Sequence, residues 1–381
     1  MPGTITPGRI KDNNRMLIYQ LIYQEKSLSQ LDISYLLHLS RPTVAGKLNE
    51  LIADGLIVKS GQITSDQLGR KACAYSIASE YRIAVGVQIT ALSVYMMAVN
   101  LYGEEIAYSV YSAEYADTDA YYEKICRFME EFILSVTPDR SSVLGIGIGM
   151  DAVPSPDGLQ IAAGGPMDNV GLSASVFYDR LHIPCRFIKE ADCAAVTDIW
   201  TYPEPDTRYY LYLSYHLSSA VVCGGSLIAG KHARCGEIAH VPFRASDRLC
   251  YCGKKGCLET VLSATALLGS EGMTHFFTEL QKKDPDHVER WQRFLEGIAY
   301  IAGPVASFFD SDIILGGEIA AFMTDQDLEE LHRLIRKEDR GFVPLDYLQI
   351  HPLPPRGVPL GAALPYIWTF LEELPDMQRI S

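Results

Sequence analysis

The pattern of apolar and polar positions separates a short helical beginning from a long body rich in strands. Apolar residues recur at helical spacing over residues 13–24, where they predict a first helix. Ser29 then precedes Asp32 by three positions and stands just ahead of a second apolar stripe. This spacing is typical of a capping box, so we expect a short second helix to begin at Ser29.

A third helix is predicted over residues 40–54, with Ser40 as its cap. Two short helices joined by a tight turn indicate a helix-turn-helix, in which the beginning of the second helix enters the major groove of DNA. We expect Arg41 to contact a guanine edge or a phosphate, and Thr43 and Lys47 to contact phosphate. All three are expected to point away from the core. The inner face of this helix is predicted to consist of Val44, Leu48, Leu51 and Ile52.

A basic hairpin is predicted after the third helix. Residues 55–79 contain two alternating β-type runs around a polar loop with Arg70 and Lys71, as expected for a wing. Residues 1–82 hold ten Lys and Arg against seven Asp and Glu, a balance of +3, whereas the whole chain has a net charge of −14. This asymmetry is compatible with a DNA-binding head, and the alternative is a three-helix packing module whose basic residues only face solvent. The predicted DNA contacts are Ser40, Arg41, Thr43, Lys47, Arg70 and Lys71.

The body begins near residue 83 with three β-type runs and a helix, and a second group of strands and helices follows. This order suggests two α/β lobes, with a ligand site in the cleft between them. The expected strands lie at 83–89, 92–103, 105–111, 143–150, 208–214 and at the start of 312–322, with a helix at 118–136. The predicted domains are residues 1–80 (DNA-binding head), 81–190 (first lobe) and 191–381 (second lobe), with a C-terminal helix that packs back on the first lobe.

Three cysteines lie within the eight-residue stretch CYCGKKGC, and a histidine lies ten residues before the first of them. Three thiolates and one imidazole form the closed tetrahedral set of a structural zinc site, with no position left for water or substrate. The alternatives are a reduced buried cluster and a local disulfide. The sequence therefore predicts one structural zinc ion per chain, held by His240, Cys250, Cys252 and Cys257.

The other six of the nine cysteines are scattered singly, and several lie in apolar surroundings. This distribution is typical of small core residues in a reducing compartment. The beginning of the chain has no apolar signal core, and its apolar runs fall short of the roughly 18 residues that a membrane span needs. We therefore expect a cytoplasmic protein that does not bind membranes.

The segments GEIAH, CYCGKKGCLE and DIILGGEIA, together with the amino-terminal helix-turn-helix, resemble the ROK family of repressors, open reading frames and sugar kinases. The resemblance covers nearly the whole chain and is greatest to the regulator branch that contains the N-acetylglucosamine and xylose repressors. It implies an N-terminal winged helix-turn-helix, mainly α, followed by a two-lobed α/β actin-like body of the sugar-kinase, ribonuclease H-like type. It also implies a homodimer or homotetramer.

The phosphate loops that the resemblance implies for a kinase are altered in this chain. The first should contain an acidic residue and paired glycines, but residues 85–93 are VGVQITALS. The second should be rich in glycine, but residues 214–220 are SYHLSSA. Backbone N–H groups approach phosphate only where side chains do not intrude. At the position of the catalytic base stands Glu190, whose longer side chain displaces the carboxylate, so we expect no enzyme activity.

The sugar-binding positions that the resemblance implies are better preserved. Glu237 and Glu259 are expected to accept hydrogen bonds from sugar hydroxyls, and His240 to bridge sugar and zinc. For Glu237 the alternative is a surface carboxylate. Lys189 replaces the family's asparagine and is interpreted either as a contact to an anionic sugar or, preferably, as an ion-pair partner of Glu190. The single histidines His216 and His232 receive no role. The predicted effector-binding residues are Lys189, Glu190, Glu237, His240 and Glu259.

These features predict a sugar-responsive transcriptional regulator, most simply a repressor of carbohydrate-metabolism genes, which binds double-stranded operator DNA and a sugar or sugar derivative. One alternative is a sugar kinase with an added DNA-binding domain. Another is a regulator of the same family that responds to a protein partner instead of a sugar.

Overall fold

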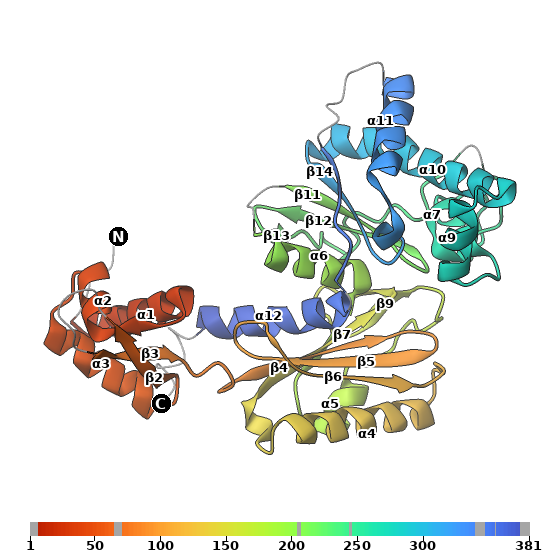
Figure 1. Cartoon of the computed structure of the whole chain (residues 1–381). Helices are drawn as coiled ribbons and strands as arrows, with labels where there is room; N and C mark the ends of the chain where they lie inside the picture. Colours follow the sequence, from red (N-terminus) through yellow and green to blue (C-terminus); the bar gives the residue numbers. More distant parts are fainter. Residues whose placement is uncertain are drawn as a thin grey trace.

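The winged head and the two α/β lobes follow one another along the chain, and α12 runs from the lobes towards the head (Figure 1). Among the residues that the structure describes, no helix is long and apolar enough to cross a lipid bilayer. The structure is a computed structural model and describes residues 7–64, 71–203, 207–243, 246–339, 347–354 and 356–373.

The head is a three-helix unit with a β-hairpin, and its helices begin where the capping residues predict. The Ser29 hydroxyl accepts from the Asp32 N–H at 3.2 Å, and Asp32 accepts in return from the Ser29 N–H at 3.1 Å, so the capping box is confirmed. The Ser40 hydroxyl accepts from the Thr43 N–H at 3.3 Å. The elements are α1 (Pro7–Glu25), β1 (Leu28–Ser29), α2 (Gln30–Leu36), α3 (Arg41–Ala53), β2 (Ile57–Thr64) and β3 (Lys71–Ile77), with sheet order β1-β3-β2.

The first lobe contains a five-stranded sheet of order β10-β7-β4-β5-β6. Strands β7 and β10 run parallel to β4, so the carboxyl ends of all three lie at one edge. Helices α4 and α5 cover one face and α12 covers the other (Figure 1). The elements are β4 (Ile83–Ile89), β5 (Ser93–Val99), β6 (Glu105–Ser112), α4 (Asp119–Val136), η1 (Arg140–Ser142), β7 (Val143–Met150), β8 (Ala152–Pro154), β9 (Ile161–Gly164), α5 (Ser175–Leu181) and β10 (Cys185–Lys189), together with α12 (Gly357–Glu373).

The second lobe repeats this plan with a sheet of order β13-β12-β11-β14-β15. Helix α6 packs on β11 and β12, and α10 packs against β14. The elements are α6 (Glu190–Thr201), β11 (Arg208–Leu213), β12 (Leu217–Cys223), β13 (Ser226–Leu227), α7 (Glu259–Leu262), α8 (Ala264–Leu268), α9 (Met273–Gln281), α10 (Pro285–Phe309), β14 (Asp312–Gly316), η2 (Ala320–Phe322), α11 (Asp325–Asp339) and β15 (Leu348–Ile350).

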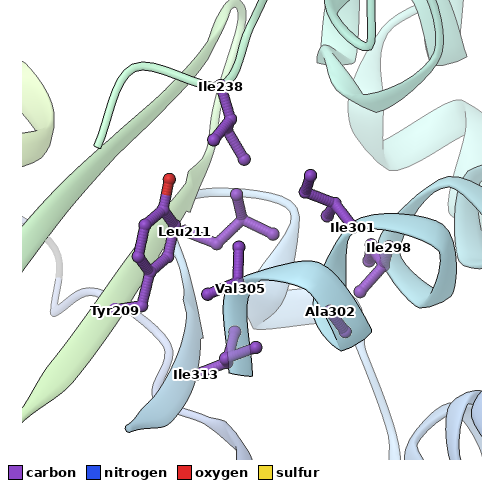
Figure 2. Close-up of a pocket in the computed structure, with 8 residues that line it drawn as sticks. All are labelled: Tyr209, Leu211, Ile238, Ile298, Ile301, Ala302, Val305 and Ile313. Carbon is purple, nitrogen blue, oxygen red and sulfur yellow. The ribbon is translucent and has the colours of Figure 1, made fainter. Parts of the chain in front are cut away.

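The core of the second lobe lies between α10 and the sheet (Figure 2). Tyr209 and Leu211 of β11 face Ile298 and Val305 of α10 across a space too small for a water molecule. Ile238 closes this space from above, and it belongs to the segment GEIAH. Burial of Ile238 therefore fixes the backbone that carries the candidate ligands on either side of it.

Helices α6 and α12 cross between the two sheets and join the lobes. At the crossing a Cβ on Gly361 would lie 1.8 Å from the carbonyl oxygen of Cys193, so only glycine fits there. A Cβ on Gly86 of β4 would likewise lie 1.7 Å from a carbonyl oxygen of α12. The Thr197 hydroxyl donates to the Gly357 carbonyl oxygen at 2.6 Å. Close backbone packing thus holds α6 against α12.

The head docks on the first lobe through α1. The Tyr23 hydroxyl donates to the Leu101 carbonyl oxygen at 2.8 Å, and the Tyr23 ring stacks on Tyr102 with centroids 4.9 Å apart. The Lys26 ammonium lies 5.5 Å from the centroid of the Tyr102 ring. Phe370 of α12 belongs to the apolar cluster that the head and the first lobe share. The position of the head is therefore set by the first lobe and α12.

Candidate functional site

One histidine and three cysteines gather beside the start of α7. The ligand atoms of His240, Cys250, Cys252 and Cys257 all lie within 4.8 Å of one another. Cys250 Sγ is 3.6 Å from His240 Nδ1, and Cys252 Sγ is 3.6 Å from Cys257 Sγ. All nine cysteines are free thiols. The structure thus brings together the predicted ligands of a closed, four-coordinate site whose chemistry suits zinc.

A tight turn positions the cysteines. The Cys250 N–H donates to the Lys254 carbonyl oxygen at 2.8 Å, and Gly253, at φ +83°, supplies the left-handed conformation that the turn needs. Gly256 has φ +74°, and a Cβ there would lie 2.5 Å from the Ser246 carbonyl oxygen. Both glycines of CYCGKKGC are therefore required by the backbone.

A cavity of about 230 Å³ adjoins this cluster at the boundary between the lobes. The carboxyl ends of β7 and β10 contribute residues from the first lobe, and β12 and the GEIAH segment contribute residues from the second. This position is where a two-lobed α/β body is expected to bind a ligand. The lining residues are Asp151, Ala152, Val153, Ala163, Gly164, Gly165, Lys189, Leu217, Ser218, Arg234, Glu237, His240 and Tyr251.

Lys189 lines the cavity, but the prediction that it pairs with Glu190 is wrong. Its ammonium nitrogen lies 3.1 Å from Glu237 Oε1 and 3.6 Å from Asp192 Oδ1. Burial lowers the pKa of Lys189, but the carboxylates of Asp192 and Glu237 outweigh burial and raise the pKa above its usual value. Lys189 therefore stays charged although only 3% of its surface is exposed. The pairing with Glu237 depends on the tertiary fold, because the two residues are 48 positions apart.

Glu190 starts α6 and is held away from the cavity. Its Oε1 accepts from Gln88 Nε2 at 2.9 Å, and it is not among the lining residues. Burial and the nearby charge of Asp151 raise the pKa of Glu190 well above its usual range. Its predicted contact with an effector thus has no support in the geometry.

Glu259 is not among the residues that line the cavity, and both of its carboxylate oxygens form hydrogen bonds within the protein. Oε1 is 2.7 Å from His216 Nδ1, and Oε2 accepts from the Leu217 N–H at 2.8 Å. Burial lowers the pKa of His216, but the hydrogen bond with Glu259 and the charge of Asp151 outweigh it, so the pKa is raised. The sequence assigned no role to His216, whereas the structure makes it the partner of a predicted effector residue.

Among the cavity residues that the sequence analysis missed, three have ionisable side chains: Asp151, Arg234 and Tyr251. Asp151 directly follows the buried strand β7, and a carboxylate at the carboxyl end of a parallel strand is a usable signal. Tyr251 stands between two predicted metal ligands, and its ring lies 5.2 Å from the ring of His240. For Arg234 the only signal is its place three residues before Glu237.

Two hairpin turns contain the segments that the sequence analysis compared with the phosphate loops of a kinase. In the turn between β4 and β5, the Thr90 N–H donates to the Ser93 carbonyl oxygen at 3.0 Å and the Ser93 N–H donates to Thr90 Oγ1 at 3.1 Å. In the turn between β11 and β12, Tyr215 is 61% exposed and the side chain of His216 is held by Glu259. Backbone N–H groups that bind within the turn are not available to a phosphate.

Of the predicted DNA-contacting residues in α3, one is exposed to solvent, one is half-buried and one is buried. Arg41 is exposed at the start of α3, and the Thr43 hydroxyl lies 2.7 Å from that of Ser40, within the cap. The prediction that Lys47 points outwards is wrong, because it is 8% exposed and its ammonium lies 2.6 Å from Glu50 Oε2. The exposed residues of α3 are instead Arg41, Pro42, Gly46, Asn49, Glu50 and Ala53.

Asn49 was missed by the sequence analysis, and asparagine is a good donor and acceptor for adenine edges. Of the predicted wing contacts, Arg70 lies outside the described residues, as does the side chain of Lys71. The wing strands β2 and β3 that flank this loop are formed as predicted.

Two family models match the chain. The model of the ROK family matches residues 85–343, and the model of the winged helix-turn-helix DNA-binding domain matches residues 11–58. The chain belongs to the ROK family. This ROK protein is 25% identical, over 360 residues, to a "Putative xylose repressor" of Caldicellulosiruptor sp. (strain Rt8B.4), and the match covers 88% of this chain and 89% of that protein.

Solved structures of the ROK family confirm the predicted fold class. A ROK family transcriptional regulator, described as a homolog of the E. coli MLC protein, superimposes with a TM-score of 0.72 at 20% identity and covers 97% of this chain and 98% of its own. A ROK family glucokinase from Streptomyces griseus, solved with glucose and AMPPNP, gives a TM-score of 0.61 at 19% identity, with coverage of 74% and 98%. The ROK body is thus a fold that regulators and kinases share.

Proposed function

We propose that this protein is a carbohydrate-responsive regulator of transcription, and specifically a repressor of carbohydrate-metabolism genes in the cytoplasm. The observation that carries the proposal is the combination, in one chain, of a winged helix with a two-lobed body whose cleft cavity adjoins the His/Cys cluster. Relatives named as xylose repressor and N-acetylglucosamine repressor support it.

Zinc has a structural role in this proposal. His240, Cys250, Cys252 and Cys257 would hold it, and a bound zinc ion supplies rigid tetrahedral cross-linking rather than a reactive position. His240 also lines the cavity, and Tyr251 is carried between two of the ligands. In this proposal the positions of His240 and Tyr251 in the cavity wall therefore depend on the zinc ion, which would hold the Cys-rich turn in place.

DNA binding is proposed to use two copies of the chain, as a homodimer or a homotetramer, on two operator half-sites. The separation of the half-sites must match the separation of the two α3 helices. An effector that binds more tightly to one arrangement of the lobes changes that separation and thereby weakens operator binding.

Arg41→Ala is expected to weaken operator binding by about 1–3 kcal/mol, because Arg41 is the exposed arginine at the groove-entering end of α3. The measurement is a titration of full-length protein against operator DNA and random DNA of equal length. Arg127→Ala, on the exposed face of α4 in the body, is the matched control and is expected to have no effect. Equal losses on operator and random DNA would remove the base-reading role of Arg41.

We expect no sustained ATP hydrolysis or sugar phosphorylation, because side chains and internal hydrogen bonds occupy both phosphate-loop positions. The similarity to a glucokinase makes this test necessary. A coupled ADP assay with glucose, xylose and N-acetylglucosamine, run beside a ROK glucokinase as the positive control, measures the activity. Turnover that continues over many cycles would establish the kinase alternative instead.

A further inference from the structure

Three of the nine cysteines are exposed: Cys73 in the head, Cys223 at the end of β12 and Cys252 in the Cys-rich turn. Cys252 Sγ lies 3.6 Å from Cys257 Sγ. The sulfurs of Cys73 and Cys223 instead contact oxygen atoms, at 3.7 Å in each case. Among the described residues, Cys252 is therefore the exposed cysteine that has a second thiol within reach.

The environment of Cys252 favours oxidation at this sulfur. A cysteine that binds a metal is held as the thiolate, which is the form that reacts with oxidants. Cys250 and Cys257 are buried, whereas Cys252 is open to solvent. An accessible thiolate next to a second cysteine is the arrangement found in redox-sensor sites. An oxidant in solution therefore meets Cys252 first, and Cys257 lies close enough to react with the product.

The turn allows Cys252 to move while Cys257 stays in place. A Cβ on Gly253 would meet no atom within 4 Å beyond its chain neighbours, so the exposed end of the turn projects into open space. Cys257 is 2% exposed, forms a β-bridge with Pro242 and accepts from the Thr260 N–H at 2.9 Å. A disulfide has an S–S bond of about 2.05 Å, so the 3.6 Å gap must shrink by about 1.5 Å. Movement of the Cys252 end alone can supply this shift.

We propose that Cys252 and Cys257 are a peroxide-sensitive pair, which forms a disulfide when hydrogen peroxide oxidises Cys252. In the first step the Cys252 thiolate attacks peroxide: the S–O bond of a sulfenic acid forms, the O–O bond breaks, and hydroxide leaves and takes up a proton from solvent. In the second step the Cys257 thiolate attacks the oxidised sulfur, the S–S bond forms, the S–O bond breaks, and a second hydroxide leaves as water. The two sulfurs together supply the two electrons that reduce one peroxide to two waters.

The disulfide removes two of the four predicted zinc ligands. His240 and Cys250 cannot complete a tetrahedral set by themselves, so the oxidised site releases its metal. His240 lines the cavity, and so does Tyr251, the neighbour of Cys252. Oxidation of an exposed sulfur thus alters the cavity wall. The regulatory consequence rests on the proposed function: the oxidised protein binds its operator more weakly than the reduced protein does.

The test treats full-length, zinc-loaded protein with hydrogen peroxide and follows three quantities: zinc release to a chromogenic chelator, disulfide position by mass spectrometry, and operator affinity. Trypsin cleaves after Lys254 and Lys255, so a Cys252–Cys257 disulfide appears as two linked peptides. We expect this disulfide, one zinc ion released per disulfide, and a loss of operator affinity of about five- to a hundredfold, the usual strength of coupling between two sites. Dithiothreitol with added zinc should reverse all three changes.

A double variant, Cys73→Ser with Cys223→Ser, is the matched control. It removes the two exposed thiols outside the Cys-rich turn and keeps all four predicted zinc ligands. Zinc release, the disulfide and the loss of operator affinity should all persist in this variant. A double variant whose operator binding no longer responds to peroxide would place the sensor at one of the two replaced cysteines and overturn the proposal.

The chemical and the regulatory parts of the proposal fail in different ways. If no linked peptides form at a peroxide concentration that already oxidises Cys73 and Cys223, the reactive pair is wrong. If the disulfide forms and zinc is released while operator affinity is unchanged, the regulatory role is overturned and the oxidation site stands. Failure of the reduced, zinc-loaded protein to bind any operator DNA would contradict the proposed function itself, and the disulfide mapping is independent of that result.

Discussion

Replacing Cys257 with serine is expected to release the metal and to lower the stability of the body by about 3 kcal/mol or more, because loss of a structural metal is among the largest single-residue effects. Cys257 is 2% exposed and forms an isolated β-bridge with Pro242, two residues after the cavity segment GEIAH. Calorimetric unfolding and elemental analysis of the purified protein measure the two consequences.

Two further variants separate metal loss from loss of packing. Cys252 is exposed, so Cys252→Ser removes a ligand without disturbing the core and should still release the metal and abolish the effector response. Cys223→Ser, at an exposed cysteine outside the cluster, should change stability by less than about 0.5 kcal/mol. Wild-type protein purified without zinc, or a Cys252→Ser variant with unchanged unfolding and response, would contradict the zinc assignment.

Gly361→Ala is expected to destabilise the protein by about 2–3 kcal/mol, the upper part of the range for overpacking a close contact. Its Cβ would lie 1.8 Å from the backbone oxygen of Cys193, which no rotamer change can relieve. The helices α6 and α12 must therefore separate, and we expect the effector response to weaken along with stability. Thermal unfolding and operator release measure both effects.

Gly46→Ala is the matched control for this prediction. Gly46 lies within α3, and outside its chain neighbours and its own helix no atom lies within 4 Å of the position that a Cβ would take. Alanine there should stabilise the protein by about 0.5–1 kcal/mol through helix propensity. If Gly361→Ala had the same stabilising effect, the close crossing of α6 and α12 would be wrong.

Local chemistry was predictable from the sequence, because the residues that make it are neighbours in the chain. Ser29 and Asp32 form their capping box within one turn, and the Cys-rich turn with its two glycines brings its ligands together within eight residues. The ROK resemblance then supplied the arrangement of the lobes, which periodicity alone leaves open.

Contacts between distant segments were not predictable in the same way. Lys189 meets Glu237 rather than its neighbour Glu190, because β10 ends opposite the GEIAH segment. Lys47 is buried because its aliphatic stem packs within the head while its ammonium reaches Glu50, an outcome that helical periodicity does not distinguish from exposure. Asp151, Arg234 and Tyr251 come from three separate loops and meet only in the folded cavity.

The docking of α1 joins the DNA-binding head to the first lobe. Tyr23 stacks on Tyr102, and Phe370 at the end of α12 packs in the apolar cluster that the head and the first lobe share. The second lobe contacts α12 through α6, where the Thr197 hydroxyl donates to the Gly357 carbonyl oxygen. In the proposed regulator, a rearrangement of the second lobe on effector binding would therefore have a direct structural route to the DNA, from α6 along α12 to the head.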